Sequence, residues 1–149
     1  MRAVFFFILA LVLGGCGDAS ENGPAEIKWD RDVCERCRML ISDRHFAAQL
    51  RDGEGKVHKF DDFGDLMGWV KEQNFNIFAY PTYVTDAETG EWLDAKEARY
   101  TKGHITPMGF GVAAHATAHE GDMSYATVAA KLFKGENCGP EAPDEPLPK

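Results

Sequence analysis

The chain has 149 residues and a formal net charge of −8 at pH 7, and 44% of its residues are hydrophobic. This length and composition fit one globular domain. The negative charge argues against nucleic acid as a partner, because an acidic surface repels the phosphate backbone.

The first fifteen residues have the pattern of a lipoprotein signal peptide. Arg2 precedes an unbroken apolar run from Ala3 to Leu13, which is shorter than the roughly 20 residues that a membrane-spanning helix needs. Leu13-Gly14-Gly15-Cys16 resembles a bacterial lipobox, so we expect cleavage after residue 15 and lipidation of Cys16. The alternative is an ordinary signal peptide followed by an incidental cysteine. Lipidation would anchor the protein to a membrane outside the cytoplasm, on the periplasmic side.

The remaining chain divides by composition into three parts. Residues 16–26 are polar with glycine and proline, which predicts a flexible tether after the lipidated Cys16. Residues 27–135 are expected to form the folded domain. Residues 136–149 carry four prolines among acidic residues, which predicts a disordered tail.

The first half of the domain predicts a hairpin, a helix and a strand. Strands are expected at Phe46–Leu50 and Lys56–Phe60, on either side of a glycine-containing turn. Asp61 or Asp62 is expected to cap a helix that runs to about Gln73, and a strand is expected over 77–85.

The second half repeats this order more loosely. Short strands are expected at Trp92-Leu93 and Ala98–Thr101, and Val112–Thr117 is an apolar segment compatible with a strand. A closing helix to about Phe133 is expected after a cap at Asp122 or Ser124. The mixture of strands and helices predicts an α+β fold in which two similar ββαβ-type halves pack as one small domain.

A cluster of sulfur atoms is the strongest functional signal. Cys34-x-x-Cys37-x-Met39 places two thiols and a thioether within six residues, and such soft donors favour Cu(I). Arg36 and Arg38 flank the thiols, so we expect them to lower the thiol pKa. With Cys16 lipidated, three cysteines remain, and an odd number argues against a purely disulfide framework.

Other interpretations of the motif remain open to different degrees. Structural zinc would need four ligands, and only His115 and His119 have finger-like spacing. A c-type haem requires histidine where Arg38 stands. A thioredoxin-like redox pair is the main rival, although such a pair opens a helix after a strand, whereas this motif precedes a hairpin. Met39 taken alone would more often be a core residue.

A second group of candidate ligands lies in the region that begins with the loop 104–111. Met108 and one of three histidines (His104, His115, His119) would complete the coordination sphere if this loop approached the N-terminal motif. Each of these histidines taken singly is more often structural. His45 and His58 are expected at the surface or in the hairpin.

Taken in order, these segments resemble the NosL family, copper-binding lipoproteins that are encoded with nitrous oxide reductase. The similarity covers roughly residues 32–132. The matching segments are the lipobox at Cys16, Cys34-x-x-Cys37-x-Met39, Leu40-Ile41-Ser42-Asp43, Phe60-Asp61-Asp62-Phe63, Tyr83-Val84-Thr85-Asp86, Trp92-Leu93-Asp94-Ala95 with Ala98 and Tyr100, and Met108-Gly109-Phe110-Gly111.

The resemblance implies a fold shared with organomercurial lyase and a protein that is a metallochaperone, not an enzyme. It implies Cu(I) binding through Cys34, Cys37 and Met39, with Met108 as a weaker candidate. It also implies delivery of copper to nitrous oxide reductase, with an ABC-type assembly complex as partner. Cys138 lies outside the family pattern.

An enzyme that uses the two thiols is the alternative of a different class. It would be a thiol oxidoreductase or an organomercurial-lyase-like protein, and the latter needs a general acid near Cys34 and Cys37. The sequence does not clearly place a carboxylate in that position.

Overall fold

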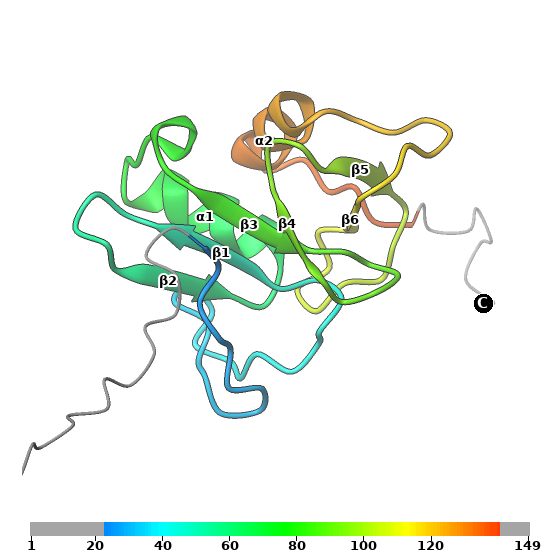
Figure 1. The fold of residues 1–149 in the computed structure, drawn as a ribbon. Helices are drawn as coiled ribbons and strands as arrows, with labels where there is room; N and C mark the ends of the chain where they lie inside the picture. The colour runs from blue at the N-terminus through cyan, green and yellow to red at the C-terminus, as the bar shows by residue number, and fades with distance from the viewer. Residues whose placement is uncertain (1–22, 141–149) are drawn as a thin grey trace, which may run out of the picture.

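The computed structural model describes residues 23–140 (Figure 1). The expected signal peptide, the lipobox with Cys16, most of the expected tether and residues 141–149 of the expected tail lie outside the described residues.

The first half of the domain follows the expected order. Strands β1 (Ala48–Arg51) and β2 (Val57–Phe60) form an antiparallel hairpin, helix α1 (Phe63–Glu72) packs on them, and β3 (Thr82–Thr85) pairs with β1 (Figure 1). The strand expected over 77–85 is shorter than expected. Its first residues form a 3-10 turn, η1 (Ile77–Ala79), because the Asn76 side chain accepts a hydrogen bond from the Phe78 N–H and caps it.

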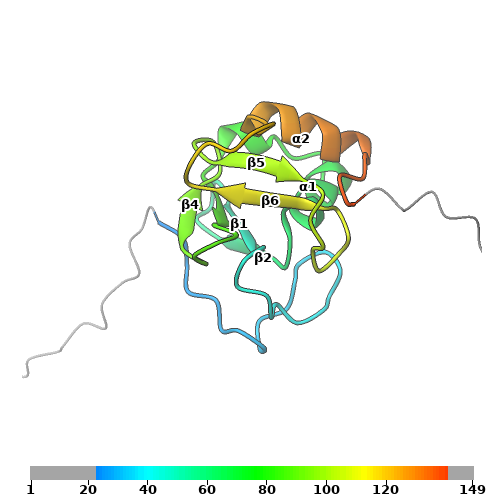
Figure 2. The same ribbon diagram turned by 90° about the vertical axis from the view of Figure 1, so that its right-hand side faces the viewer.

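The second half uses its strands differently. Strand β4 (Trp92–Asp94) joins the edge of the first sheet, whose order is β2-β1-β3-β4, while β5 (Arg99–Lys102) and β6 (Val112–His115) form a separate two-stranded sheet. Helix α2 (Tyr125–Lys134) lies along this second sheet and packs against α1 (Figure 2). The α+β class is confirmed, but among the described residues no strand follows α2 to complete a second ββαβ unit.

Both helices begin at one of the expected capping residues. The Asp62 carboxylate accepts a hydrogen bond from the backbone N–H of Asp65, and the Ser124 hydroxyl accepts one from Thr127. Each cap satisfies a donor that the first helical turn leaves unpaired. The apolar faces of the two helices supply much of the core between the sheets, with Leu66, Met67, Val70, Val128 and Leu132 fully or almost fully buried.

Hydrogen bonds of the described residues reach beyond the expected domain at both ends. The buried side chain of Gln49 bonds to both backbone groups of Ala25, although residues up to 26 are expected to be a flexible tether. At the other end, the Cys138 N–H donates to the Phe110 carbonyl and the Gly103 N–H donates to the Cys138 carbonyl. The packed structure therefore continues past the expected boundary at residue 135. Among the described residues, no helix is both long and apolar enough to cross a bilayer.

Candidate metal centre

The cysteine motif lies on a closed loop that is fixed to the first sheet. The Cys34 N–H donates to the Met39 carbonyl at 2.8 Å, and Arg38 takes a left-handed conformation (φ 67°) that reverses the chain inside the loop. The Glu35 N–H donates to the Lys59 carbonyl of β2 at 2.8 Å. The motif thus docks on the edge of a strand and does not open a helix, which is not the setting of a thioredoxin-like redox pair.

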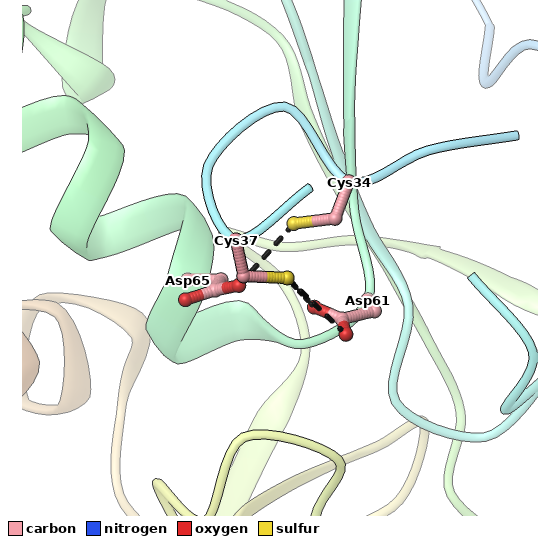
Figure 3. Close-up of side chains that lie close together, drawn as sticks. All are labelled: Cys34, Cys37, Asp61 and Asp65. Atoms are coloured by element: carbon pink, nitrogen blue, oxygen red, sulfur yellow. Dashed lines mark hydrogen bonds between the residues drawn. The ribbon is translucent and has the colours of Figure 1, made fainter. Parts of the chain in front are cut away.

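Two aspartates complete the site around the thiols (Figure 3). Asp61 follows β2 directly, and Asp65 lies in the first turn of α1. The Cys34 thiol donates to Asp65 Oδ2 at 3.2 Å, and the Cys37 Sγ lies 3.6 and 3.7 Å from the two oxygens of Asp61. One donor atom from each of these four residues lies within 4.8 Å of the others, a separation that a single ion could bridge. We call these four residues the sulfur cluster.

The sulfur cluster is largely buried and opens outward at Cys37. Cys34 and Asp65 are fully buried and Asp61 is 2% exposed, whereas Cys37 is half-buried. The charge of Asp65 is balanced by Arg36, whose Nη1 lies 2.8 Å from Asp65 Oδ1. Such a paired charge avoids most of the penalty for burial of a lone carboxylate.

A glycine in α1 makes room for Arg36. A Cβ added at Gly68 would lie 2.4 Å from the Arg36 guanidinium carbon, closer than van der Waals contact permits. Arg36 therefore crosses the helix and also pairs with Glu72, its Nε 2.9 Å from Glu72 Oε1. This second pair fixes the cysteine loop to α1.

The thiols in this site are protonated at neutral pH. Burial raises the pKa of Cys37 to about 11 and raises that of Cys34 further. The expected lowering of the thiol pKa by Arg36 and Arg38 is wrong, because desolvation dominates and Arg36 is already paired with carboxylates. Burial, with a further contribution from the negative charge of Asp65, raises the pKa of Asp61 to about 6.

This arrangement gives each thiol a proton acceptor. A cation that binds the sulfurs must displace the thiol protons, and metal binding at cysteine is coupled to proton release in this way. Asp61 and Asp65 lie where those protons would go, and their oxygens add hard donors beside the two soft sulfurs.

The two candidate methionines lie on different segments of the chain. The Met39 side chain is 56% exposed, so it is not a core residue, whereas Ile41 two positions later is fully buried. Met108 is half-buried on the loop 104–111, and its N–H donates to Asp62 Oδ2 at 3.3 Å. The structure therefore ties the Met108 loop to Asp62, the residue next to Asp61.

The remaining candidates lie elsewhere. His104, His115 and His119 gather around the β5–β6 sheet, where two of them face Glu88. Cys138 is buried against the loop 104–111 and does not belong to the sulfur cluster.

His58 lies on β2 of the hairpin, one of the two places expected for it. It is only 6% exposed, with its Nε2 3.0 Å from Asp52 and its ring against Trp69.

Sequence reasoning missed Asp61 and Asp65 as site residues. The feature that could have indicated them is a cluster of acidic residues at the start of α1. Three aspartates occur there within five positions, although one is enough to cap the helix. Asp65 also falls in the helical repeat between the buried Phe63 and Leu66, where an unpaired carboxylate would be costly.

Comparison with known proteins gives a result for the fold alone. No protein-family model matches the chain, and no curated protein sequence is significantly similar to it. The fold is similar to that in the crystal structure of the copper chaperone NosL from Shewanella denitrificans, with a TM-score of 0.55 and 17% sequence identity. The similarity covers 83% of this chain and 95% of that one, so the chain has a NosL-like fold throughout its domain.

Proposed function

We propose that this protein is a Cu(I)-binding metallochaperone that delivers copper for the assembly of an extracytoplasmic copper enzyme. The observation that carries the proposal is the side-by-side placement of the Cys34 and Cys37 thiols in a mostly buried site on a NosL-like fold. Thiolates and thioethers are the ligands that select Cu(I) over hard cations. Met39 and Met108 are the proposed thioether ligands.

Loading of the site uses the two aspartates as proton acceptors. Cu(I) binds the sulfurs as thiolates, so the protons of Cys34 and Cys37 must leave. Asp65 accepts a hydrogen bond from Cys34 and Asp61 lies against Cys37, which gives each proton a short path. Asp61 suits this role because its pKa of about 6 lets it take up and give back a proton near neutral pH.

Release of the metal is proposed to occur by ligand exchange at the exposed side of the loop. Cys37 is half-buried, and its neighbours Met39 and Leu40 are 56% and 53% exposed, so a client ligand can approach the metal from this side. As the client ligand joins, the proton held by Asp61 returns to Cys37 and weakens its bond to copper. A site of two or three sulfur ligands leaves room for the incoming donor.

The place of action and the partners are part of the same proposal. Lipid on Cys16 would hold the domain at a membrane on the periplasmic side, with nitrous oxide reductase as client and an ABC-type complex as assembly partner. The lipobox at Cys16 and the resemblance of the matching sequence segments to the NosL family support this proposal. Mass spectrometry of the N-terminal peptide from cells tests the anchor, since an unmodified Cys16 peptide would contradict it.

The proposal is tested by titrating the reduced full-length protein with Cu(I) against a competing chelator. We expect one Cu(I) per chain, with sulfur neighbours in X-ray absorption spectra. Cys34→Ser and Cys37→Ser should each weaken binding by about tenfold or more, and Met39→Leu by less, because thiolate is the stronger ligand. Cys138→Ser is the matched control and should bind as the parent does. Parent-like affinity in all three motif variants would refute the assignment.

An organomercurial-lyase-like activity is the second candidate, and one observation favours it. Asp61, with its pKa raised to about 6, is the general acid near the thiols that the sequence did not clearly place. Such an enzyme binds mercury through thiolate while an acid protonates the departing carbon. Release of benzene from a phenylmercury salt, lost in Cys37→Ser and Asp61→Asn, would support this candidate over the chaperone.

A further inference from the structure

We infer that Glu88, His115 and His119 form a second metal site, for a divalent ion of borderline softness such as Zn²⁺. Glu88 lies in the turn between β3 and β4, His115 ends β6, and His119 lies on the segment between β6 and α2. The β3–β4 turn lies against β6 because the Ala87 N–H donates to the Ala114 carbonyl. In Figure 2, β6 points towards β4. This site is separate from the sulfur cluster.

The distances fit a tetrahedral ion. Glu88 Oε1 lies 3.6 Å from His119 Nε2 and 3.9 Å from His115 Nδ1, and all three atoms are within 4.8 Å of one another. Bonds of about 2.0–2.2 Å in tetrahedral geometry place ligand atoms roughly 3.3–3.6 Å apart. Because the two histidine nitrogens lie within 4.8 Å of each other, movements of about 1 Å at an exposed glutamate and a half-buried histidine would close the site.

Two buried histidine nitrogens at this site have no hydrogen-bond partner among the described residues. They are His115 Nδ1 and His119 Nε2, and the His115 side chain is only 7% exposed. Buried polar atoms are nearly always paired, so two unpaired ones aimed at the same carboxylate oxygen indicate a missing partner. A cation between them would satisfy both.

Thr101 orients His115 for this role. Its hydroxyl lies 2.8 Å from His115 Nε2 and 2.7 Å from His104 Nε2. The hydroxyl has one proton, so it can donate to His104 while it accepts from the Nε2–H of His115. This tautomer leaves the lone pair of His115 on Nδ1, towards Glu88. Metal-bound histidines commonly donate their other ring N–H to an oxygen in this way.

A plain ion pair between Glu88 and a charged histidine is less consistent with the geometry. The separations of 3.6 and 3.9 Å exceed hydrogen-bond length, although Glu88 is exposed enough to move closer.

The donor set defines the class of ion. Two imidazoles and a carboxylate favour Zn²⁺ and similar divalent ions, whereas the sulfur cluster favours a soft monovalent one. Three protein ligands leave a fourth position for water. The ion would join the β3–β4 turn, the end of β6 and the segment before α2.

The test is a calorimetric Zn²⁺ titration of the full-length protein that carries Cys34→Ser and Cys37→Ser. This background removes both thiols of the sulfur cluster, so its outcome is independent of Cu(I) binding there. We expect one Zn²⁺ per chain with only nitrogen and oxygen neighbours in X-ray absorption spectra. Addition of Glu88→Gln or His119→Ala should weaken Zn²⁺ binding by about tenfold or more.

Matched controls separate this site from general surface binding. Glu91→Gln alters another exposed glutamate that follows the same turn, and His45→Ala alters an exposed histidine that contacts Ala87. Both should bind Zn²⁺ as the background protein does. The inference fails if the background protein binds no Zn²⁺, or if Glu88→Gln and His119→Ala bind as tightly as the controls. Circular dichroism checks that each variant is folded.

Discussion

Cu(I) affinity at the sulfur cluster should depend steeply on pH. The pKa of Cys37 is about 11 and that of Cys34 is higher, so both thiols are fully protonated from pH 6 to pH 8. Each thiol that binds as thiolate therefore loses one proton. Each proton released raises the apparent affinity tenfold per pH unit, so two protons give a rise of about 100-fold per unit.

Asp61 should modify this dependence above its own pKa. With a pKa of about 6, Asp61 is mostly ionised near pH 7 and can accept one thiol proton as copper binds, because the two new thiolates beside it favour its protonated form. The net release then falls below two protons above pH 6, so the affinity should rise by less than 100-fold per pH unit there. In Asp61→Asn the full slope of about 100-fold per unit should apply throughout.

Chelator competition at several pH values, corrected for protonation of the chelator, measures this slope. Cys37→Ser should reduce the slope by one proton, because one thiol remains. Met39→Leu is the control, since a thioether carries no proton: its affinity should fall at every pH while the slope stays unchanged. An affinity that is independent of pH between 6 and 8 would refute protonated thiols as the copper ligands.

Three further predictions concern stability, measured by urea unfolding. Asp61→Asn should raise the free energy of unfolding by about 1–3 kcal/mol at pH 7. Folding raises the pKa of the Asp61 carboxyl above its ordinary value, so the parent protein loses stability as the pH rises from about 4 to 6. Equal stability of parent and variant at both pH 4 and pH 7 would contradict this. Tyr100→Phe should cost about 1–2 kcal/mol, since the buried Tyr100 hydroxyl donates to the Ala95 carbonyl at 2.6 Å; an unchanged unfolding midpoint would show that this bond contributes nothing. Gly64→Ala should destabilise by about 1–3 kcal/mol, although alanine favours helix, because the new Cβ would lie 2.0 Å from the Phe110 ring; a more stable variant would mean that Phe110 moves freely.

Local patterns predicted the elements that depend on neighbouring residues. The hairpin, both helices and their caps at Asp62 and Ser124 follow from turn residues, apolar periodicity and capping chemistry. The strand over 77–85 was predicted too long because β-compatible residues do not show that Asn76 would cap a 3-10 turn.

The electrostatics of the site depended on tertiary packing and could not be read from the chain. Arg36 lies beside the cysteines in sequence, which suggested that it lowers the thiol pKa, but in the fold it pairs with Asp65 and Glu72. Asp61 and Asp65 reach the thiols only because β2 and α1 bring them there. Burial then raises each thiol pKa, an effect that requires knowledge of what surrounds the loop.

The Asp62 carboxylate has a consequence for how the domain opens. This one side chain accepts hydrogen bonds from the Asp65 N–H, the Thr106 hydroxyl and the Met108 N–H, so it ties the first turn of α1 to a loop more than forty residues away. Fraying of that turn and detachment of the loop should then be a single cooperative event. The amide hydrogens of Asp65 and Met108 would exchange with deuterated solvent at matching rates, because the first turn of α1 and the loop would open together.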